Sequence, residues 1–432
     1  MKVTACLERC RQDNRNGHLM DTNATLILCI YLAIQSVELL LTHINLKHLA
    51  VHGNRVPTGF EKYVDKELLT RVNSYTLENG RVRLAAAVLD VTVTIVFLFG
   101  GPLNWYNNFI HAQGWPLTVS AIVFFVLLSI AGTLLHIPFD IYTTFHVERK
   151  YEFNRKSPGL WIADLVKGLV LSTILYSILV AVIFKLLAAV PGYWWLAGWL
   201  FLFSFSVFLL YISPSVLEPL FNKFTPITEP ALESLIRQTM TRAGLAVSRV
   251  FSMDASKRST HTNAYFTGIG RVKRIVLFDT LIKNHSPEEI TAILAHEAGH
   301  WRKKHLLKTL LLTQSLLFVG FVIADQLIKN ELVIQIFHIE QSTLYTKLFL
   351  IGFLGSLAVF PLKPLGSRLS RRHEHEADDF AVELTGDRES LATALIKLGR
   401  DNLANLHPHP WYAAVYYSHP PIVERVTRLR RP

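Results

Sequence analysis

The chain carries little charge for its length. Asp, Glu, Lys and Arg make up 18% of its 432 residues, against about 25% in an average soluble protein. Half of the residues are hydrophobic, and the mean hydropathy is +0.30. The missing charge is concentrated in long uncharged runs, which are typical of chains that cross a lipid bilayer. The composition therefore argues against a soluble protein of two or three domains.

Cysteine is also scarce. The three cysteines, Cys6, Cys10 and Cys29, all lie among the first thirty residues. This excludes a disulfide framework and a thiolate zinc site in the rest of the chain, and the spacing of Cys6 and Cys10 fits neither a zinc finger nor a redox pair. A cleavable signal peptide is not evident, because the first apolar run, residues 24–42, is too long and no small-residue cleavage site follows it.

Positive charge exceeds negative charge. The chain has 44 Lys and Arg against 33 Asp and Glu, which gives a formal net charge of +11. Such an excess can indicate binding to nucleic acid, or loops that face an anionic membrane leaflet. The apolar runs favour the membrane, so we expect a lipid bilayer and no nucleic acid among the partners.

Seven apolar runs are long enough to span a bilayer as helices, which takes about 20 residues each. They cover residues 24–42, 84–103, 116–139, 165–190, 194–212, 306–327 and 344–362. A Pro191-Gly192 turn separates the fourth and fifth runs, which are therefore expected to form a tight helical hairpin. The sequence predicts an all-α polytopic membrane protein of about seven transmembrane helices.

The distribution of Lys and Arg predicts the orientation in the membrane. The basic segments are residues 43–83, 140–164, 213–305 and 363–432. The segment 104–115, by contrast, has no Lys or Arg. By the positive-inside rule the basic segments are cytoplasmic and the N-terminus lies outside, although Arg9, Arg11 and Arg15 argue against this orientation. We expect a multi-pass protein of a bacterial inner membrane or of the endoplasmic reticulum membrane.

Four ionisable residues fall within or beside the apolar runs: Glu38, Asp90, His136 and Asp140. Such side chains are costly in lipid and usually face the interior of a helix bundle or a water-filled cavity. They can alternatively lie near helix ends and reach the interface. The sequence favours neither interpretation.

The long segment 213–305 is the candidate for a folded domain outside the membrane. Residues 230–243 have the pattern of an amphipathic helix. Three short runs rich in β-branched and aromatic residues follow, at residues 250–253, 263–267 and 274–278. Residues 268–270 are Gly-Ile-Gly, which is a turn signal, so the last two runs are expected to form a small β-hairpin.

This segment also contains a His-Glu-x-x-His motif from His296 to His300. A capping box of Ser286 and Glu289 marks the start of its helix. His296 and His300 are one turn apart on one face, where two imidazoles can chelate one zinc ion. Glu297 lies about 100° around the helix, which suits a general base better than a metal ligand. A motif this short also occurs by chance on ordinary helices.

A catalytic zinc needs a third protein ligand and one open position. A third His six residues after His300 is absent, because Leu306 occupies that position. The run 371–378 offers Glu374 and Asp378, which are four residues apart and share a helix face. We expect Glu374 to bind zinc and Asp378 to accept a hydrogen bond from a ligand imidazole.

The same run contains rivals for the third ligand. Glu376 is directed about 200° away from Glu374, which makes it the weaker candidate, and His373 and His375 are alternatives. The cluster can also be an ordinary polar face at the membrane edge. Because both ligand motifs lie just outside apolar runs, we expect the site at or just inside the cytoplasmic interface.

Stabilising an oxyanion requires hydrogen-bond donors. His419, within Tyr-Ser-His-Pro-Pro, and Arg425, six residues later, are a candidate pair. From the sequence alone, both can equally be ordinary surface residues.

Taken together, these motifs resemble the type I CAAX prenyl protease family of integral-membrane zinc peptidases. The similar stretches include residues 138–164, 219–226, 257–266, 296–300 and 418–421. The resemblance covers roughly residues 60–430, and the first twenty-odd residues lie outside it.

The resemblance implies seven transmembrane helices around a water-filled chamber, with a cytoplasmic α+β zinc peptidase domain of gluzincin type. It implies that His296, His300 and Glu374 bind one Zn²⁺ and that Glu297 is the base. It further implies that Asn263 and Ala264, on an edge strand, hold the substrate backbone and that His419 and Arg425 steady the tetrahedral intermediate. The implied reaction removes the C-terminal tripeptide of a prenylated Cys-a-a-X protein.

These inferences divide the chain into five segments. They are a polar segment 1–23, five transmembrane helices 24–213, a zinc peptidase core 214–305, two transmembrane helices 306–362 and a cytoplasmic segment 363–432 that holds the third ligand. The expected partner is a peptide or protein, prenylated or membrane-associated.

Two other functions stay open. Related proteins exist in bacteria, which generally do not prenylate proteins, so a quality-control protease of the inner membrane is one alternative. A transporter or scaffold with a structural zinc is the other. A structural zinc usually has four protein ligands, so the additional Glu297 favours the enzyme.

Overall fold

The computed structural model describes residues 2–245, 249–267 and 274–431, with side chains from Thr22 onward. Seven helices are long and apolar enough to cross a membrane. They are α1 (Lys2–His52), α2 (Lys66–Phe99), α4 (Leu117–Tyr142), α6 (Pro158–Ala189), α7 (Trp194–Ile212), α11 (His305–Ile328), and α13 (Leu344–Val359), which continues into α14 (Lys363–Thr385). The prediction of about seven spanning helices is confirmed.

The second apolar run was predicted to continue to residue 103, and this is wrong. The chain breaks at Gly100 and Gly101, where Gly101 has a φ of 101°, a conformation that favours glycine. A separate helix, α3 (Pro102–Ala112), follows with proline in its first turn. The uncharged segment after the second run is therefore mostly helical.

The spanning helices form a closed ring. Along the chain, α1 packs against α2, α2 against α4, α4 against α6, α6 against α7, α7 against α11, and α11 against α13. The ring closes because α13 also contacts α1. Within it, α6 and α7 are the expected hairpin, joined by the turn at Pro191 and Gly192. A ring of this kind is the arrangement that the implied chamber requires.

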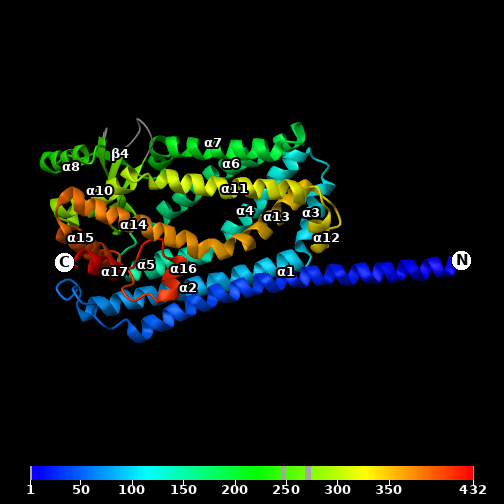
Figure 1. Cartoon of the computed structure of the whole chain (residues 1–432), viewed down its shortest axis with the longest axis horizontal. Coiled ribbons are helices and arrows are strands. Elements are labelled where there is room, and N and C mark those ends of the chain that lie inside the picture. Colours follow the sequence, from blue (N-terminus) through cyan, green and yellow to red (C-terminus); the bar gives the residue numbers. More distant parts are fainter. Residues whose placement is uncertain (1, 246–248, 268–273, 432) are drawn as a thin grey trace.

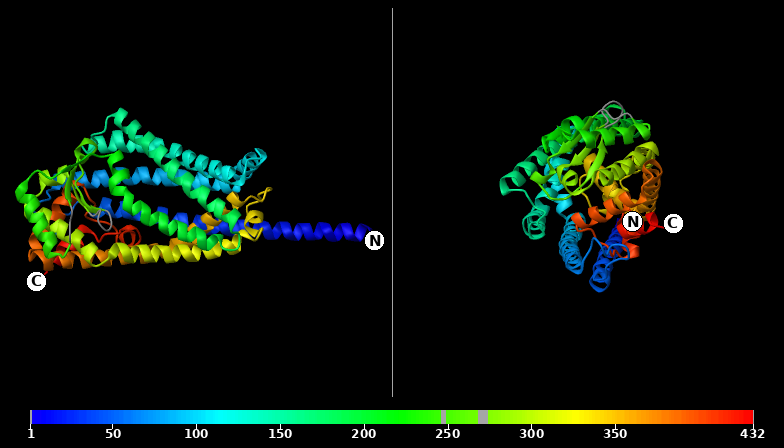
Figure 2. Two further views of the ribbon diagram at one scale, coloured as in Figure 1. Left: turned by 90° about the horizontal axis from the view of Figure 1, so that it is seen from above. Right: turned by 90° about the vertical axis from the view of Figure 1, so that its left-hand side faces the viewer.

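The two ends of the bundle carry different structures (Figure 1). The short helices α3 and α12 (Leu332–Ile336) lie at one end. The small sheet lies at the other end with α8 (Pro230–Arg242), α10 (Pro287–Arg302), α15 (Arg388–Asp401) and α17 (Ile422–Leu429). Figure 2 shows the same bundle from above and end-on, with the C-terminus at the end that holds the sheet.

The sheet has four strands in the order β1-β2-β4-β3. They are β1 (Phe224–Pro226), β2 (Arg249–Met253), β3 (Ala264–Thr267) and β4 (Arg274–Phe278). The expected pairing of β3 and β4 is antiparallel, and its Gly-Ile-Gly turn lies outside the described residues. Two features were not expected, the three-residue β1 and the parallel pairing of β2 with β4. One edge of β3 carries no strand among the described residues.

Each end of the bundle has its own core. The core at the sheet end is almost entirely aliphatic and joins the sheet to α8, α10, α15 and α17, through residues such as Ile236, Ile275 and Leu294. The core at the far end is rich in aromatic side chains, among them Phe124 and Trp194. At the sheet end, burial of these side chains from water supplies the main favourable term for folding. At the far end, where the core lies between membrane-spanning helices, van der Waals packing holds the helices together.

Candidate metal centre

Helix α10 carries two of the candidate ligands. It begins at the capping box, in which Ser286 Oγ accepts from Glu289 N and Glu289 Oε2 accepts from Ser286 N. Apolar residues between the cap and the motif are buried in the aliphatic core. His296 and His300 therefore project from a helix that is fixed at its start and along its length.

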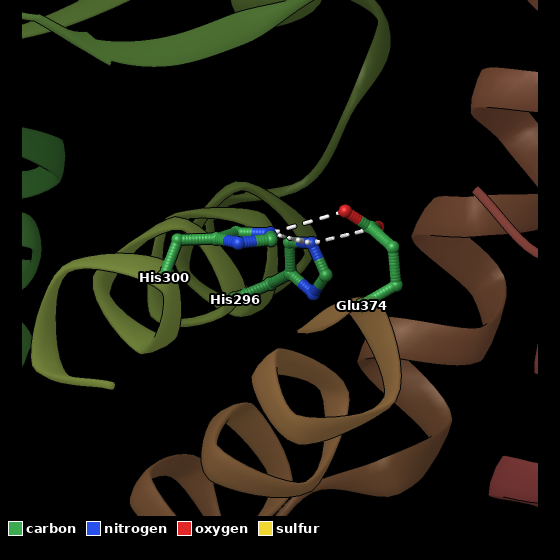
Figure 3. A group of neighbouring side chains, drawn as sticks. All are labelled: His296, His300 and Glu374. Carbon is green, nitrogen blue, oxygen red and sulfur yellow. Dashed lines mark hydrogen bonds and ion pairs between the residues drawn. The ribbon is translucent and has the colours of Figure 1, made fainter. Parts of the chain in front are cut away.

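Helix α14 brings the third candidate to this pair. It crosses α10 so closely that a Cβ on Gly299 would lie 2.9 Å from Ala377 Cα. Only glycine permits this approach. Glu374 lies three residues before Ala377 on α14, and the close crossing places it beside the two histidines (Figure 3). The His-Glu-x-x-His pattern leaves residue 299 free, so the importance of its glycine was not evident from the motif.

The three side chains converge on one point (Figure 3). The Nε2 atoms of His296 and His300 are 3.2 Å apart. Glu374 Oε1 lies 3.3 Å from His300 Nε2, and Glu374 Oε2 lies 3.4 Å from His296 Nε2. The buried Glu374 Oε2 has no hydrogen-bond partner among the described residues.

These separations fit a metal ion. Two ligand atoms about 2.0–2.1 Å from a tetrahedral zinc lie about 3.3 Å from each other. The separation of the two Nε2 atoms, and the distance from each of them to one or the other Glu374 oxygen, are within about 0.2 Å of that value. A buried carboxylate oxygen without a hydrogen bond, beside the imidazole of His296, is also consistent with a metal ligand.

His296 is held directly by a carboxylate. Asp378 Oδ1 lies 2.8 Å from His296 Nδ1. Asp378 is fixed in turn by Arg425, whose Nε and Nη2 donate to its two oxygens at 2.9 and 2.6 Å. All three groups are buried. This arrangement turns Nε2 of His296 toward Glu374 and keeps the proton on Nδ1.

His300 is held through a second imidazole. Its Nδ1 lies 3.0 Å from His305 Nδ1, and His305 Nε2 lies 3.1 Å from Glu376 Oε2. His305 is buried and stacks on His373 with ring centroids 4.0 Å apart. If His300 Nε2 faces a metal, His300 Nδ1–H donates to His305, and His305 Nε2–H donates to Glu376.

The rivals for the third ligand lie elsewhere. Glu376 contacts His305, His373 stacks on His305, and His375 Nε2 lies 3.6 Å from Glu424 Oε1. Among the described residues, the ligand cluster consists of the two α10 histidines and Glu374.

Glu297 lines a cavity of about 410 Å³ together with His300 and Glu374. Apolar side chains, including Phe266 and Trp301, form part of its wall. Burial raises the pKa of the Glu297 carboxyl, and the neighbouring histidines oppose this rise. A carboxylate with a raised pKa is a stronger base near neutral pH.

The two candidate oxyanion donors have different surroundings. His419 is 64% exposed, with Nε2 3.4 Å from Glu374 Oε1 and Nδ1 2.9 Å from Ser418 Oγ. Arg425 is buried in its ion pair with Asp378, and its Nη1 is 3.5 Å from Glu374 Oε2. The sequence did not indicate that Arg425 pairs with Asp378.

The candidate substrate-binding residues begin the free edge of the sheet. Asn263 is exposed, and its Oδ1 accepts from the backbone N–H of Ala264 at 2.8 Å. Asn263 O accepts from Phe278 N on β4, so the backbone of this residue continues the β3–β4 pairing. Strand β3 itself packs beside α10.

Two family models match adjacent parts of the chain. A model described as CAAX prenyl protease N-terminal, five membrane helices, matches residues 45–223. A model described as peptidase family M48 matches residues 226–432. Their boundary falls at β1, the first strand of the sheet, in the segment that follows the fifth spanning helix.

Individual proteins match over most of their length. CAAX prenyl protease 1 of Saccharomyces cerevisiae is 33% identical, over 87% of this chain and 88% of the relative. The uncharacterised metalloprotease YhfN of Bacillus subtilis is 31% identical, over 78% of this chain and 82% of the relative. The crystal structure of S. mikatae Ste24p is similar with a TM-score of 0.87 at 29% identity, covering 95% of this chain and 99% of that one.

Proposed function

This chain belongs to the CAAX prenyl protease family of M48 metallopeptidases, and we propose that it removes the C-terminal tripeptide from prenylated proteins that end in Cys-a-a-X. It is a multi-pass membrane metallopeptidase. The observation that carries the proposal is the convergence of His296, His300 and Glu374 beside Glu297. The two family models together cover nearly the whole chain.

We propose zinc as the metal, bound by His296, His300 and Glu374. Two imidazoles and one carboxylate are the donor set of several zinc peptidases, and they leave a fourth position open. A bound zinc supplies a Lewis acid that polarises the scissile carbonyl and increases the acidity of water.

The chain's own residues supply the proton transfers. Glu297 takes a proton from the attacking water as its oxygen bonds to the carbonyl carbon. The same carboxyl then gives the proton to the amide nitrogen as the carbon–nitrogen bond breaks, which balances the hydrolysis. His419 is placed to donate from Nε2 to the developing oxyanion, because this atom faces the ligand cluster from the open side.

Arg425 acts in this account mainly through Asp378. Its Nε and Nη2 are already used by that carboxylate, so it fixes the partner of His296. Its charge also lies close to Glu374, where it stabilises negative charge at the centre of the site.

The substrate backbone is proposed to pair with the free edge of β3. An extended peptide can add to an exposed strand through main-chain hydrogen bonds. Asn263 and Ala264 stand at the start of this edge, and the cavity that Glu297 lines touches Phe266 and Thr267 at its end. The scissile bond then passes over the histidines of α10.

We place the site on the cytoplasmic side. The basic segment 140–164 is bound to the catalytic end, because Arg258 donates to Asp164 Oδ1 and Oδ2 at 3.0 and 2.9 Å. The basic loops and the catalytic domain therefore share one side of the membrane, which the positive-inside rule assigns to the cytoplasm. In the proposed division, the catalytic domain combines residues 214–305 and 363–432.

The test uses two peptides that differ only in a farnesyl group on the cysteine of a Cys-a-a-X terminus. Purified protein in lipid should release the tripeptide from the farnesylated peptide, as measured by mass spectrometry. A chelator should stop release, and zinc should restore it. Equal cleavage of both peptides would contradict a requirement for the prenyl group. It would favour the broader specificity expected of a quality-control peptidase. Cleavage that survives complete removal of metal would contradict the metallopeptidase mechanism.

A further inference from the structure

His419 also lines a second cavity, whose lining does not include the ligand cluster. It has a volume of about 610 Å³, and we call it the Arg83 pocket. Its polar wall contains Arg83, Tyr417 and four asparagines, Asn45, Asn79, Asn402 and Asn405. None of the described residues that line it is Asp or Glu. Since His419 belongs to this wall and also approaches Glu374, the pocket adjoins the proposed catalytic centre.

Arg83 has no acidic partner within ion-pair distance among the described residues. It lies in α2, just before the second apolar run, and its side chain is exposed. Arg83 faces a pocket whose wall offers hydrogen-bond donors and no negative charge. In addition, the buried Nδ2 of Asn405 has no hydrogen-bond partner among the described residues.

The pocket also has a defined position along the proposed substrate path. Asn402 is bound to the segment that leads into the edge strand, because it donates to Thr262 O and accepts from Thr262 N, each at 3.1 Å. The Arg83 pocket therefore lies at the start of β3, whereas the cavity lined by Phe266 and Thr267 lies at its end.

The direction of the strand decides which end of a substrate reaches the pocket. A peptide that pairs antiparallel with β3 runs from the end of β3 toward its start. Its C-terminal side then points toward Asn402 and Arg83, and its N-terminal side toward the other cavity. A tripeptide beyond the scissile bond spans about 10 Å when extended.

We propose that the Arg83 pocket binds the terminal carboxylate of the substrate, with Arg83 as the ion-pair partner. A guanidinium can donate two parallel hydrogen bonds to a carboxylate, and the asparagine amides supply further donors. The proposal rests on the proposed function, because only removal of a C-terminal tripeptide brings a free carboxylate so close to the cleaved bond. The pocket thereby selects chain ends over internal segments of a protein.

The test compares two farnesylated peptides of the same sequence, one ending in a free acid and the other in an amide. The wild-type protein should cleave the acid with a kcat/KM about 10- to 100-fold higher, as expected for a hydrogen bond to a charged group. Arg83→Gln should lose this preference, because its kcat/KM for the acid should fall to that for the amide. Arg83→Lys should retain part of the preference.

Arg81→Gln is the matched control. Arg81 lies two residues earlier on the same helix, is also exposed, and does not line the pocket. This variant should keep the full preference for the acid. Cleavage of the amide by Arg83→Gln shows that the variant is folded and active.

The outcomes separate this proposal from the function on which it rests. If Arg83→Gln prefers the acid as strongly as the wild type does, the carboxylate assignment is overturned and the peptidase stands. If the wild type cleaves both peptides equally, the assignment is also overturned. If the wild type cleaves neither peptide, the proposed function fails and this proposal fails with it.

Discussion

The two imidazoles of the cluster are supported in different ways. His296 has a side chain that is 9% exposed and contacts Asp378 directly, whereas His300 is 26% exposed and reaches Glu376 only through His305. The first support is an ion-paired carboxylate and the second is a neutral ring. A carboxylate is the stronger acceptor, because charge-assisted hydrogen bonds are roughly twice as strong as neutral ones.

The difference follows from where each histidine stands. His296 lies on the buried side of the site, between α14 and α17, where a bidentate Arg425–Asp378 pair can be enclosed. His300 borders the open cavity and the first turn of α11. The group that supports His300 must leave room for substrate in this cavity. The flat ring of His305, stacked on His373, supports His300 without filling the cavity. In the proposed site, His296 is therefore the more rigidly held of the two histidines.

The largest expected effect on zinc binding comes from replacing one of the three proposed ligands. Glu374→Ala should lose zinc, since two imidazoles alone leave the site with too few protein ligands. His296→Ala and His300→Ala should do the same. Zinc content of purified protein by elemental analysis is the measurement, with about one zinc per chain expected in the wild type. Full zinc retention by Glu374→Ala would contradict the ligand set.

Removal of the direct support should have the next largest effect. Asp378→Ala should weaken zinc binding by about 10- to 100-fold, because loss of such partners typically does so. It should also destabilise the fold by up to about 3–5 kcal/mol, since the buried Arg425 loses its bidentate partner and keeps only the longer contact with Glu374. Chelator competition and urea unfolding measure the two effects.

The neighbouring Asp379 provides the control for that variant. It pairs with Arg428 in an exposed ion pair, which contributes about 0–1 kcal/mol. Asp379→Ala should therefore leave zinc binding and stability nearly unchanged. An equal loss in both variants would mean that charge in general, and not the contact with His296, determines the effect of Asp378.

Removal of the indirect support should have a smaller effect. His305→Ala should weaken zinc binding by about 10-fold, at the low end of the range for outer partners. His305→Asn should restore part of the affinity, because its Oδ1 can accept from His300 Nδ1–H in place of the ring nitrogen. The absorption spectrum of the cobalt-substituted protein reports the same change in geometry without any turnover.

Glu376→Gln should have the smallest effect of the series. A glutamine oxygen still accepts from His305 Nε2–H, so zinc should be retained. If His305→Ala or Glu376→Gln weakens zinc binding more than Asp378→Ala does, the ranking of the two sides is reversed.

The sequence predicts the direct support and misses the indirect one for a physical reason. Glu374 and Asp378 are four residues apart on one helix, so the helical period alone places them on one face. His305 lies beyond the end of α10, after Lys304, which adopts a left-handed φ of 58°. Helical periodicity does not extend across such a turn, so the position of His305 relative to His300 could not be derived from spacing.

The same distinction applies to the fold. The apolar runs, the capping box of α10 and the β3–β4 pairing depend on neighbours in the sequence, and they could be predicted. The closed ring of helices, the parallel β2–β4 pairing and the contact of Gly299 with Ala377 join distant segments. These depend on packing between elements, which no local pattern specifies.

The most direct test of the central claim separates metal binding from catalysis in Glu297→Gln. This variant keeps His296, His300 and Glu374, so it should hold zinc as the wild type does. It has no carboxylate to accept the proton of water, and single-turnover cleavage should slow by about 10²–10⁴-fold. Zinc content and cleavage are measured on the same purified sample. Wild-type cleavage with zinc in place would contradict the account, because the residue beside the ligands would then play no part in the hydrolysis.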